Sequence, residues 1–231
     1  MSFTYHCTVR QLFLIFIILP VAMQGQVAFS MATDASILRN FDSKQQFTVF
    51  GQSVYIQCHF ESNSTFYALV SYHLNGKYNN PLIAEAKQPG IQPQRVGFTN
   101  RSEMKLRQVS IGYKHYLRGS YGRENSYNIY GMGGFGLIIG RATNTFSTPI
   151  DTTRYSVPNN IAEGVGNFKR LSLDLSAGFE FPVGYELYFY SEVRVHIPTT
   201  EYPSNYLVKN DNAPFLGSIN VGIRILFNND D

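Results

Sequence analysis

Hydrophobic and polar residues alternate along the last strand-like stretch of the chain, residues 215–227. Apolar residues occupy nearly every odd position from Phe215 to Phe227, whereas even positions include Asn220 and Arg224. A period of two is the signature of a β-strand, because successive side chains point to opposite faces of a sheet. The stretch is also as long as the ~9–11 residues with which a tilted strand crosses a bilayer. It predicts a strand with one apolar and one polar face.

Seven stretches upstream show the same period and predict further strands. They cover about residues 27–41, 47–60, 65–74, 103–117, 126–141, 171–181 and 185–197. In most of them one face gathers apolar residues and the other gathers polar or charged residues. Residues 126–141 carry glycines in both parities, which leaves two interpretations open. Either a β-bulge lies at Gly133 and Gly134, or the two faces cannot be assigned.

Short and long connections alternate between the predicted strands. Turn-forming residues predict tight connections at residues 61–64, 118–125 and 182–184, and longer polar segments follow at residues 76–100, 142–166 and 198–214. The first connection, residues 42–44, is short where the alternation requires a long one. Eight strands, short turns at one end, long loops at the other and an apolar outward face together predict an all-β fold, an eight-stranded antiparallel up-and-down transmembrane β-barrel.

The glycine-rich residues 130–137 and the final residues 222–227 are the most specific features of this pattern. With them the chain resembles the small eight-stranded outer-membrane β-barrels of Gram-negative bacteria, such as the transmembrane domain of outer-membrane protein A. The resemblance covers nearly all of the chain after residue 25. It implies a monomer in the cell outer membrane, with a structural or surface-interaction role. The implied partners are outer-membrane lipid, lipopolysaccharide and the barrel-assembly machinery.

Residues 1–25 have the organisation of a secretory signal peptide. Arg10 supplies the positive charge and residues 12–22 the apolar centre. Cleavage is expected after Gly25 or, alternatively, after Ser30. Residues 26–231 then form one exported outer-membrane barrel domain.

Composition and charge exclude several other classes of protein. The 231 residues carry a net charge of +3, which is too small to predict nucleic acid as a partner. No apolar run after residue 25 approaches the ~18 residues of a membrane helix, so a closed barrel is the remaining way to span lipid. Once residues 1–25 are removed, Cys58 is a single cysteine, which excludes a disulfide framework.

A soluble lipocalin-like binding barrel is the alternative fold. It also has eight antiparallel strands but turns its apolar face inward around a ligand, so the alternation alone does not separate the two. Aromatic residues near the strand ends favour the membrane barrel, because they suit a girdle at the lipid–water interface. They are Tyr72, Tyr113, Tyr127, Phe181, Tyr185, Phe215 and Phe227.

No motif predicts a catalytic, cofactor or metal site. Histidines are scattered over four predicted strands without the spacing of metal ligands: His59, His73, His115 and His196. His73 with Ser71, or His196 with Glu192, is an acid–base pair that a lipid-modifying enzyme could use, but no motif supports either. We expect no enzymatic activity, no cofactor and no metal. A narrow channel for small molecules and lipid-modifying catalysis are the alternative functions.

The polar faces predict a charge network inside the barrel. Counted from the turn side of each strand, four charged residues lie at similar depth: Lys114, Glu180, Glu186 and Arg224. Buried charges are stable only when they are paired, so we expect these residues to meet, with Arg224 beside Glu186 or Glu180. Three further residues are expected to form an upper layer: Asp174, Glu192 and Arg194. The network would fill the lumen, as side chains do in eight-stranded barrels.

Work at the cell surface would then fall to the long loops. These loops lie near residues 77–100, 147–166 and 199–213. Four cations in or beside the first loop are candidates for contact with lipopolysaccharide phosphates: Lys77, Lys87, Arg95 and Arg101.

Overall fold

The computed structural model describes residues 27–122, 127–184, 186–200 and 203–227. The predicted signal peptide, residues 1–25, lies outside the described residues. Within them, no helix has the length and hydrophobicity needed to cross a bilayer.

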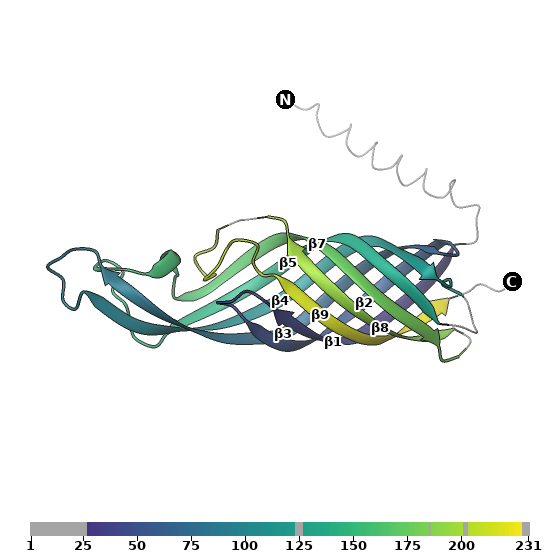
Figure 1. The fold of residues 1–231 in the computed structure, drawn as a ribbon, viewed down its shortest axis with the longest axis horizontal. Helices are drawn as coiled ribbons and strands as arrows, with labels where there is room; N and C mark the ends of the chain where they lie inside the picture. Colours follow the sequence, from purple (N-terminus) through teal and green to yellow (C-terminus); the bar gives the residue numbers. More distant parts are fainter. Residues whose placement is uncertain (1–26, 123–126, 185, 201–202, 228–231) are drawn as a thin grey trace, which may run out of the picture.

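Eight long strands form a closed antiparallel barrel (Figure 1). Each strand pairs with its neighbours along the chain, and β1 pairs with β9 to close the ring. The predicted fold class is therefore confirmed. The strands are β1 (Ala28–Asn40), β2 (Phe47–Glu61), β3 (Ser64–Ala86), β4 (Arg95–Arg118), β5 (Asn128–Phe146), β7 (Gly164–Pro182), β8 (Leu187–Pro198) and β9 (Leu216–Phe227).

The two ends of the barrel differ in their connections. The turn end carries the connections after β2, β4 and β7, together with the start of β1 and the end of β9. The loop end carries the other four connections. There β3 and β4 run far beyond the barrel as a hairpin (Figure 1), on which the short strand β6 (Tyr155–Ser156) pairs with the end of β3. The 3-10 turn η1 (Pro158–Asn160) follows β6.

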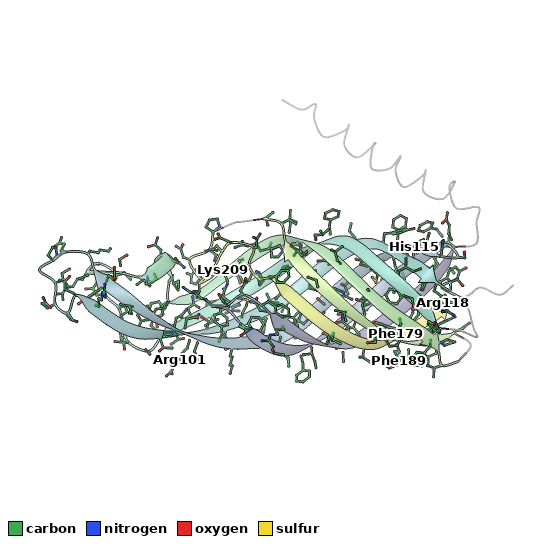
Figure 2. The ribbon with its side chains drawn as sticks, viewed as in Figure 1. Arg101, His115, Arg118, Phe179, Phe189 and Lys209 are labelled. Atoms are coloured by element: carbon green, nitrogen blue, oxygen red, sulfur yellow. The ribbon has the colours of Figure 1, made fainter. Side chains whose placement is uncertain are left out.

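The outer wall of the barrel is apolar toward the turn end. Side chains on this face are exposed although they are large and hydrophobic, and Figure 2 shows one of them, Phe179, near the turn end. We call this surface the apolar belt. Its members include Met31, Ile37, Val54, Ile56, Phe66, Val70, Leu74, Val109, Ile111, Phe135, Ile139, Leu171, Leu175, Phe179, Val193, Ile219, Val221 and Ile223. Exposed apolar area of this extent around a closed barrel requires a lipid environment.

The glycine-rich strand β5 is regular, and the bulge considered at Gly133 and Gly134 is absent from it. Its pairing with β7 is continuous from Asn128 to Asn144. Gly134 faces the lumen, where an added Cβ would lie 2.6 Å from Tyr67 Oη, and the same distance separates that oxygen from a Cβ at Gly112. These two glycines admit the tyrosine ring to the lumen, while Gly133 faces outward.

The strands near the hairpin are longer than predicted. Residues 76–86 and 95–100 were expected in a loop but belong to β3 and β4, and the connection itself spans residues 87–94. Beyond the belt the apolar side chains turn inward, so the outward apolar pattern expected of a membrane strand ends there. The inward side chains form what we call the loop-end core: Leu38, Phe47, Val49, Tyr78, Ala84, Phe98, Met104, Leu106, Ile138, Ala142, Phe146, Tyr155, Val157, Ile161, Phe168, Leu207, Val208 and Leu216.

Candidate functional site

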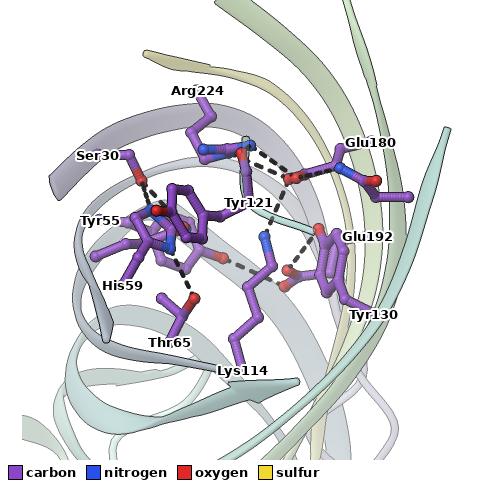
Figure 3. A network of polar contacts seen from close by, with 12 residues as sticks. Ser30, Tyr55, His59, Thr65, Lys114, Tyr121, Tyr130, Glu180, Glu192 and Arg224 are labelled. Atoms are coloured by element: carbon purple, nitrogen blue, oxygen red, sulfur yellow. Dashed lines mark hydrogen bonds and ion pairs between the residues drawn. The ribbon is translucent and has the colours of Figure 1, made fainter. Parts of the chain in front are cut away.

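Glu180 bridges two buried cations near the turn end of the lumen (Figure 3). Its Oε2 lies 3.0 Å from Lys114 Nζ, and its Oε1 lies 2.8 Å from Arg224 Nη2. All three side chains are at most 2% exposed. Asn128 Nδ2 also donates to Glu180 Oε1, at 3.1 Å. The structure thus brings together the residues that the sequence placed at similar depth on strands β4, β7 and β9.

Tyr121 closes the lumen from the turn-end connection between β4 and β5. Its carbonyl oxygen accepts a hydrogen bond of 2.8 Å from Arg224 Nη2. Its ring stacks on the His59 imidazole, with centroids 4.5 Å apart (Figure 3). Both ring nitrogens of His59 are occupied, one by Ser30 Oγ at 2.8 Å and the other by Thr65 Oγ1 at 2.7 Å. His59 is therefore a structural residue of this end.

Aromatic rings cover the two cations of this layer. Lys114 Nζ lies 3.8 Å from the centroid of the Tyr130 ring, and the Arg224 guanidinium lies 3.9 Å from the centroid of the Tyr188 ring. Cation–π contacts of this kind are strongest where water is excluded. They add to the pairing with Glu180 in offsetting the cost of burial.

The predicted contribution of Glu186 to this network is wrong. Glu186 is exposed, and β8 begins after it, at Leu187. The backbone nitrogen of Val183 donates to Leu187 O at 2.8 Å, which closes a turn longer than the predicted residues 182–184. Glu186 lies within this turn, so the alternation of a strand does not apply to it.

Glu192 and Arg194 form a second layer farther from the turn end. Arg194 Nε donates to Glu192 Oε1 at 2.9 Å, and Arg194 Nη2 contacts the same oxygen. Two tyrosine hydroxyls also donate to this carboxylate, Tyr55 and Tyr130, each at 3.2 Å. The predicted pair is thus present, with tyrosine partners that the sequence did not identify.

Asp34 is a lumen carboxylate that the sequence analysis missed. It is 4% exposed and accepts a hydrogen bond of 3.1 Å from Tyr190 Oη. Its even position in β1, opposite in parity to Met31 and Ile37, was the sequence signal that could have identified it.

The layer of Glu180 and the layer of Glu192 and Arg194 leave no space between them for a water molecule. The described residues that line this region include Tyr55, Lys114, Tyr130, Tyr190 and Arg224.

Asp174 belongs to a third layer and not, as predicted, to the layer of Glu192 and Arg194. His196 Nδ1 lies 2.9 Å from its Oδ1, Ser172 Oγ donates to the same oxygen at 2.8 Å, and Gln108 Nε2 donates to Oδ2 at 2.7 Å. Ser110 Oγ donates to Oδ2 as well. Strand tilt shifts neighbouring registers, so depth counted along one strand did not place Asp174 correctly.

These contacts do not form either of the acid–base pairs considered from the sequence. His196 pairs with Asp174 and not with Glu192, and Ser71 Oγ makes no hydrogen bond to His73 or to any other described residue. Ser172 donates to Asp174 rather than to an imidazole. Within the described ranges, no group of three or more His, Cys, Asp or Glu side chains is arranged to hold a metal ion.

The connection between β8 and β9 covers the lumen at the loop end. Its residues Leu207, Val208 and Ala213 are at most 1% exposed. Arg170 on β7 donates through Nε to Ala213 O and through Nη2 to Asn210 Oδ1, each at 3.3 Å. The loop is thus packed into the mouth of the barrel.

An ion pair at the loop end joins two connections. Lys209 Nζ lies 3.5 Å from Asp42 Oδ1. Burial raises the pKa of the Asp42 carboxyl above its ordinary value, because desolvation outweighs the neighbouring cation. Gln45 Nε2 also donates to Lys209 O at 2.9 Å. The two connections therefore close over the lumen together.

Comparison with known proteins gives a match in fold alone. No family model and no curated protein sequence matches the chain. Among solved structures, Neisserial surface protein A superposes with a TM-score of 0.51 at 13% identity, covering 86% of this chain and 97% of that one.

Two further structures match less well. The N-terminal β-barrel domain of Pseudomonas aeruginosa OprF has a TM-score of 0.43 at 12% identity, covering 86% of this chain and 97% of that one. The attachment invasion locus protein Ail of Yersinia pestis has a TM-score of 0.42 at 12% identity, covering 89% of this chain and 100% of that one.

The closed ring, the apolar belt and the match to Neisserial surface protein A agree with one another. Strands of this kind cross the outer membrane with an apolar outer face and a polar interior. The chain has the fold of the small eight-stranded outer-membrane β-barrels of Gram-negative bacteria.

Proposed function

We propose that this protein is a closed outer-membrane barrel whose work is done at the cell surface by the structure at its loop end. The observation that carries the proposal is the filled lumen. Three polar layers occupy the bore, and the connection between β8 and β9 covers its mouth. A barrel filled in this way supports a structural or surface-interaction role better than the alternative of small-molecule passage.

The loop end has the features of a rigid surface structure. Short turns face the periplasm and long connections face outward in outer-membrane barrels, which assigns the loop end to the cell exterior. The strands that leave the belt bury a core of their own, whose members include Phe98 and Phe168, 4% and 5% exposed. Such a core holds the hairpin of β3 and β4 in a fixed position. It would present a constant surface to outer-membrane lipid and to other cells.

Planar-bilayer recording tests the filled lumen. We expect no conductance steps from the full chain. A variant carrying Tyr55→Ala and Tyr130→Ala removes two large rings from the bore but keeps the β8–β9 connection over its mouth, so it should give no steps either. Conductance steps from the unmodified protein would overturn the proposal.

Epitope insertion tests the assignment of the loop end to the cell exterior. Gly90 at the hairpin tip and Gly184 at the turn end both have open space around them. On intact cells we expect antibody to label an epitope inserted after Gly90 and not one inserted after Gly184. The reverse result would place the hairpin in the periplasm and remove the surface role.

A further inference from the structure

Four neighbouring strands end their part of the apolar belt on a cation. On β4 the outward residue after Val109 is Arg107, and on β5 the outward residue after Ile139 is Arg141. On β7 Leu171 is followed by Lys169, and on β3 the first charged residue beyond Leu74 is Lys77. The cations therefore stand where the wall of the barrel leaves the lipid.

Cross-strand pairing crowds these charges together. Lys105 lies directly opposite Arg141, and both Arg107 and Lys169 lie opposite Ile139. Like charges directly opposite each other in a sheet are destabilising. With Arg101, which projects outward beside the hairpin (Figure 2), these residues make up what we call the cationic girdle: Lys77, Arg101, Lys105, Arg107, Arg141 and Lys169.

The girdle has one acidic neighbour, Glu103, which lies directly opposite Lys77. No described carboxylate forms an ion pair with any of its six members. Glu103, which is the acidic residue among them on β4, hydrogen bonds with the neutral Asn75. Arg107 makes a cation–π contact with Tyr72, at 5.8 Å, which leaves its charge uncompensated. An anion from outside the chain would relieve the repulsion.

The opposite wall of the barrel provides a comparison within the same molecule. Beyond the belt, β1 carries Arg39, whereas β2 carries Thr48, the chain beyond β8 carries Thr199, and the chain before β9 carries Phe215. One cation on four strands is an ordinary surface. At the corresponding positions β3, β4, β5 and β7 carry four cations, Lys77, Arg107, Arg141 and Lys169, so the girdle is one-sided.

We infer that the cationic girdle binds the phosphate groups of the outer-leaflet glycolipid, lipopolysaccharide. The inference rests on the proposed function, because that assigns the loop end to the cell exterior. The belt below the girdle contacts acyl chains, so a bound lipid would present its phosphates at the height of Arg107 and Arg141. Arginine guanidinium groups match phosphate oxygens in pairs, and lysine adds charge.

Two of the cations proposed from the sequence do not belong to this site. Lys87 Nζ donates to Thr152 O at 2.8 Å, and Arg95 Nε lies 3.4 Å from Glu85 Oε1. Both lie at the far tip of the hairpin, away from the belt. Lys77 and Arg101 remain in the girdle.

Titration of diphosphorylated lipid A into the full-length protein in zwitterionic detergent tests the inference, with bound lipid counted by native mass spectrometry. The girdle variant carries Lys105→Gln, Arg107→Gln, Arg141→Gln and Lys169→Gln. The matched control carries Lys44→Gln, Lys87→Gln, Arg95→Gln and Arg154→Gln, which removes the same net charge elsewhere. We expect the apparent Kd to rise at least about tenfold in the girdle variant and less than about twofold in the control.

Lipid A without phosphates should bind the girdle variant and the unmodified protein equally. If the four-fold variant fails to fold, the single variants Lys105→Gln and Arg141→Gln should each weaken binding by about two- to fivefold. Equal weakening of lipid A binding in the girdle variant and its control would mean that net charge alone causes the effect. That result would overturn the inference. So would displacement of lipid A by equimolar inorganic pyrophosphate. Because the epitope experiment reports orientation alone, either failure leaves the proposed function standing.

Discussion

The inward face of the same strands is polar in one half of the molecule and apolar in the other. In the belt, β4 turns Val109 and Ile111 outward and Lys114 inward. Beyond Arg107 it turns Leu106 and Met104 inward, while its charged residues face water. The surrounding medium decides the character of the outer face, apolar in lipid and polar in water, and the inner face has the opposite character.

The two halves also treat charge in opposite ways. Inside the belt, each of the buried cations Lys114, Arg194 and Arg224 contacts a carboxylate. At the girdle, the half-buried Lys105 and the exposed Arg141 face each other without one. Burial makes an unpaired charge costly, whereas solvent tolerates it. Ion pairing is thus required for stability in the lumen. On the outer wall the unpaired cations remain available to bind an anion.

The largest expected effect comes from breaking the pairing in the lumen at Glu180. Glu180→Met leaves Lys114 and Arg224 buried beside each other with no carboxylate between them. We expect a loss of about 3–5 kcal/mol in the free energy of unfolding. Guanidinium unfolding in phospholipid vesicles, followed by the shift between folded and unfolded bands on a gel, measures it. Glu186→Met, in the exposed turn, is the control and should change stability by less than about 0.5 kcal/mol.

A smaller loss is expected from the loop-end core. Leu106 points inward and is 2% exposed, so Leu106→Ala should cost about 2–4 kcal/mol by removing packed atoms and leaving a cavity. The same change at Leu74, which is 53% exposed in the belt, exchanges contacts with lipid and should cost less. Equal losses in the two variants would contradict the inverted arrangement of the faces.

The smallest effect concerns the facing cations of the girdle. Lys105→Glu converts the like-charge pair with Arg141 into an opposite-charge pair and should stabilise the protein by about 0.5 kcal/mol in detergent. Lys105→Gln removes the repulsion alone and should gain less. High salt should reduce both gains, because it screens exposed charges. Destabilisation by both substitutions would mean that Lys105 and Arg141 do not repel each other.

The alternation of apolar residues predicted the barrel because lipid imposes it on the outer face. It assigned the inward face of Lys114, Glu180 and Arg224 correctly, since each lies within a strand. It failed for Glu186, which lies in a turn, and for residues 76–100, where water replaces lipid and the apolar residues turn inward. In those residues the alternation is present, but the apolar residues occupy the positions of opposite parity.

Contacts between strands were harder to predict than faces. The partners Tyr55, Tyr130 and Tyr190 are polar only at their hydroxyls, so they did not stand out as members of a charge network. Asp174 meets His196 because the registers of β7 and β8 bring Asp174 opposite it, and no feature within either strand fixes that register. Lateral pairing depends on the closure of the whole barrel.

A double-mutant cycle between Arg224 and Glu180 tests most directly the claim that paired charges fill the lumen. When Arg224 is present, removing Glu180 leaves two buried cations, Lys114 and Arg224, without a carboxylate partner. After Arg224→Met, removing Glu180 leaves one such cation, Lys114. We therefore predict that Glu180→Met costs less in the Arg224→Met background, with a coupling of about 1–3 kcal/mol. Additive losses, with no coupling beyond experimental error, would contradict the pairing and the inward orientation of both residues.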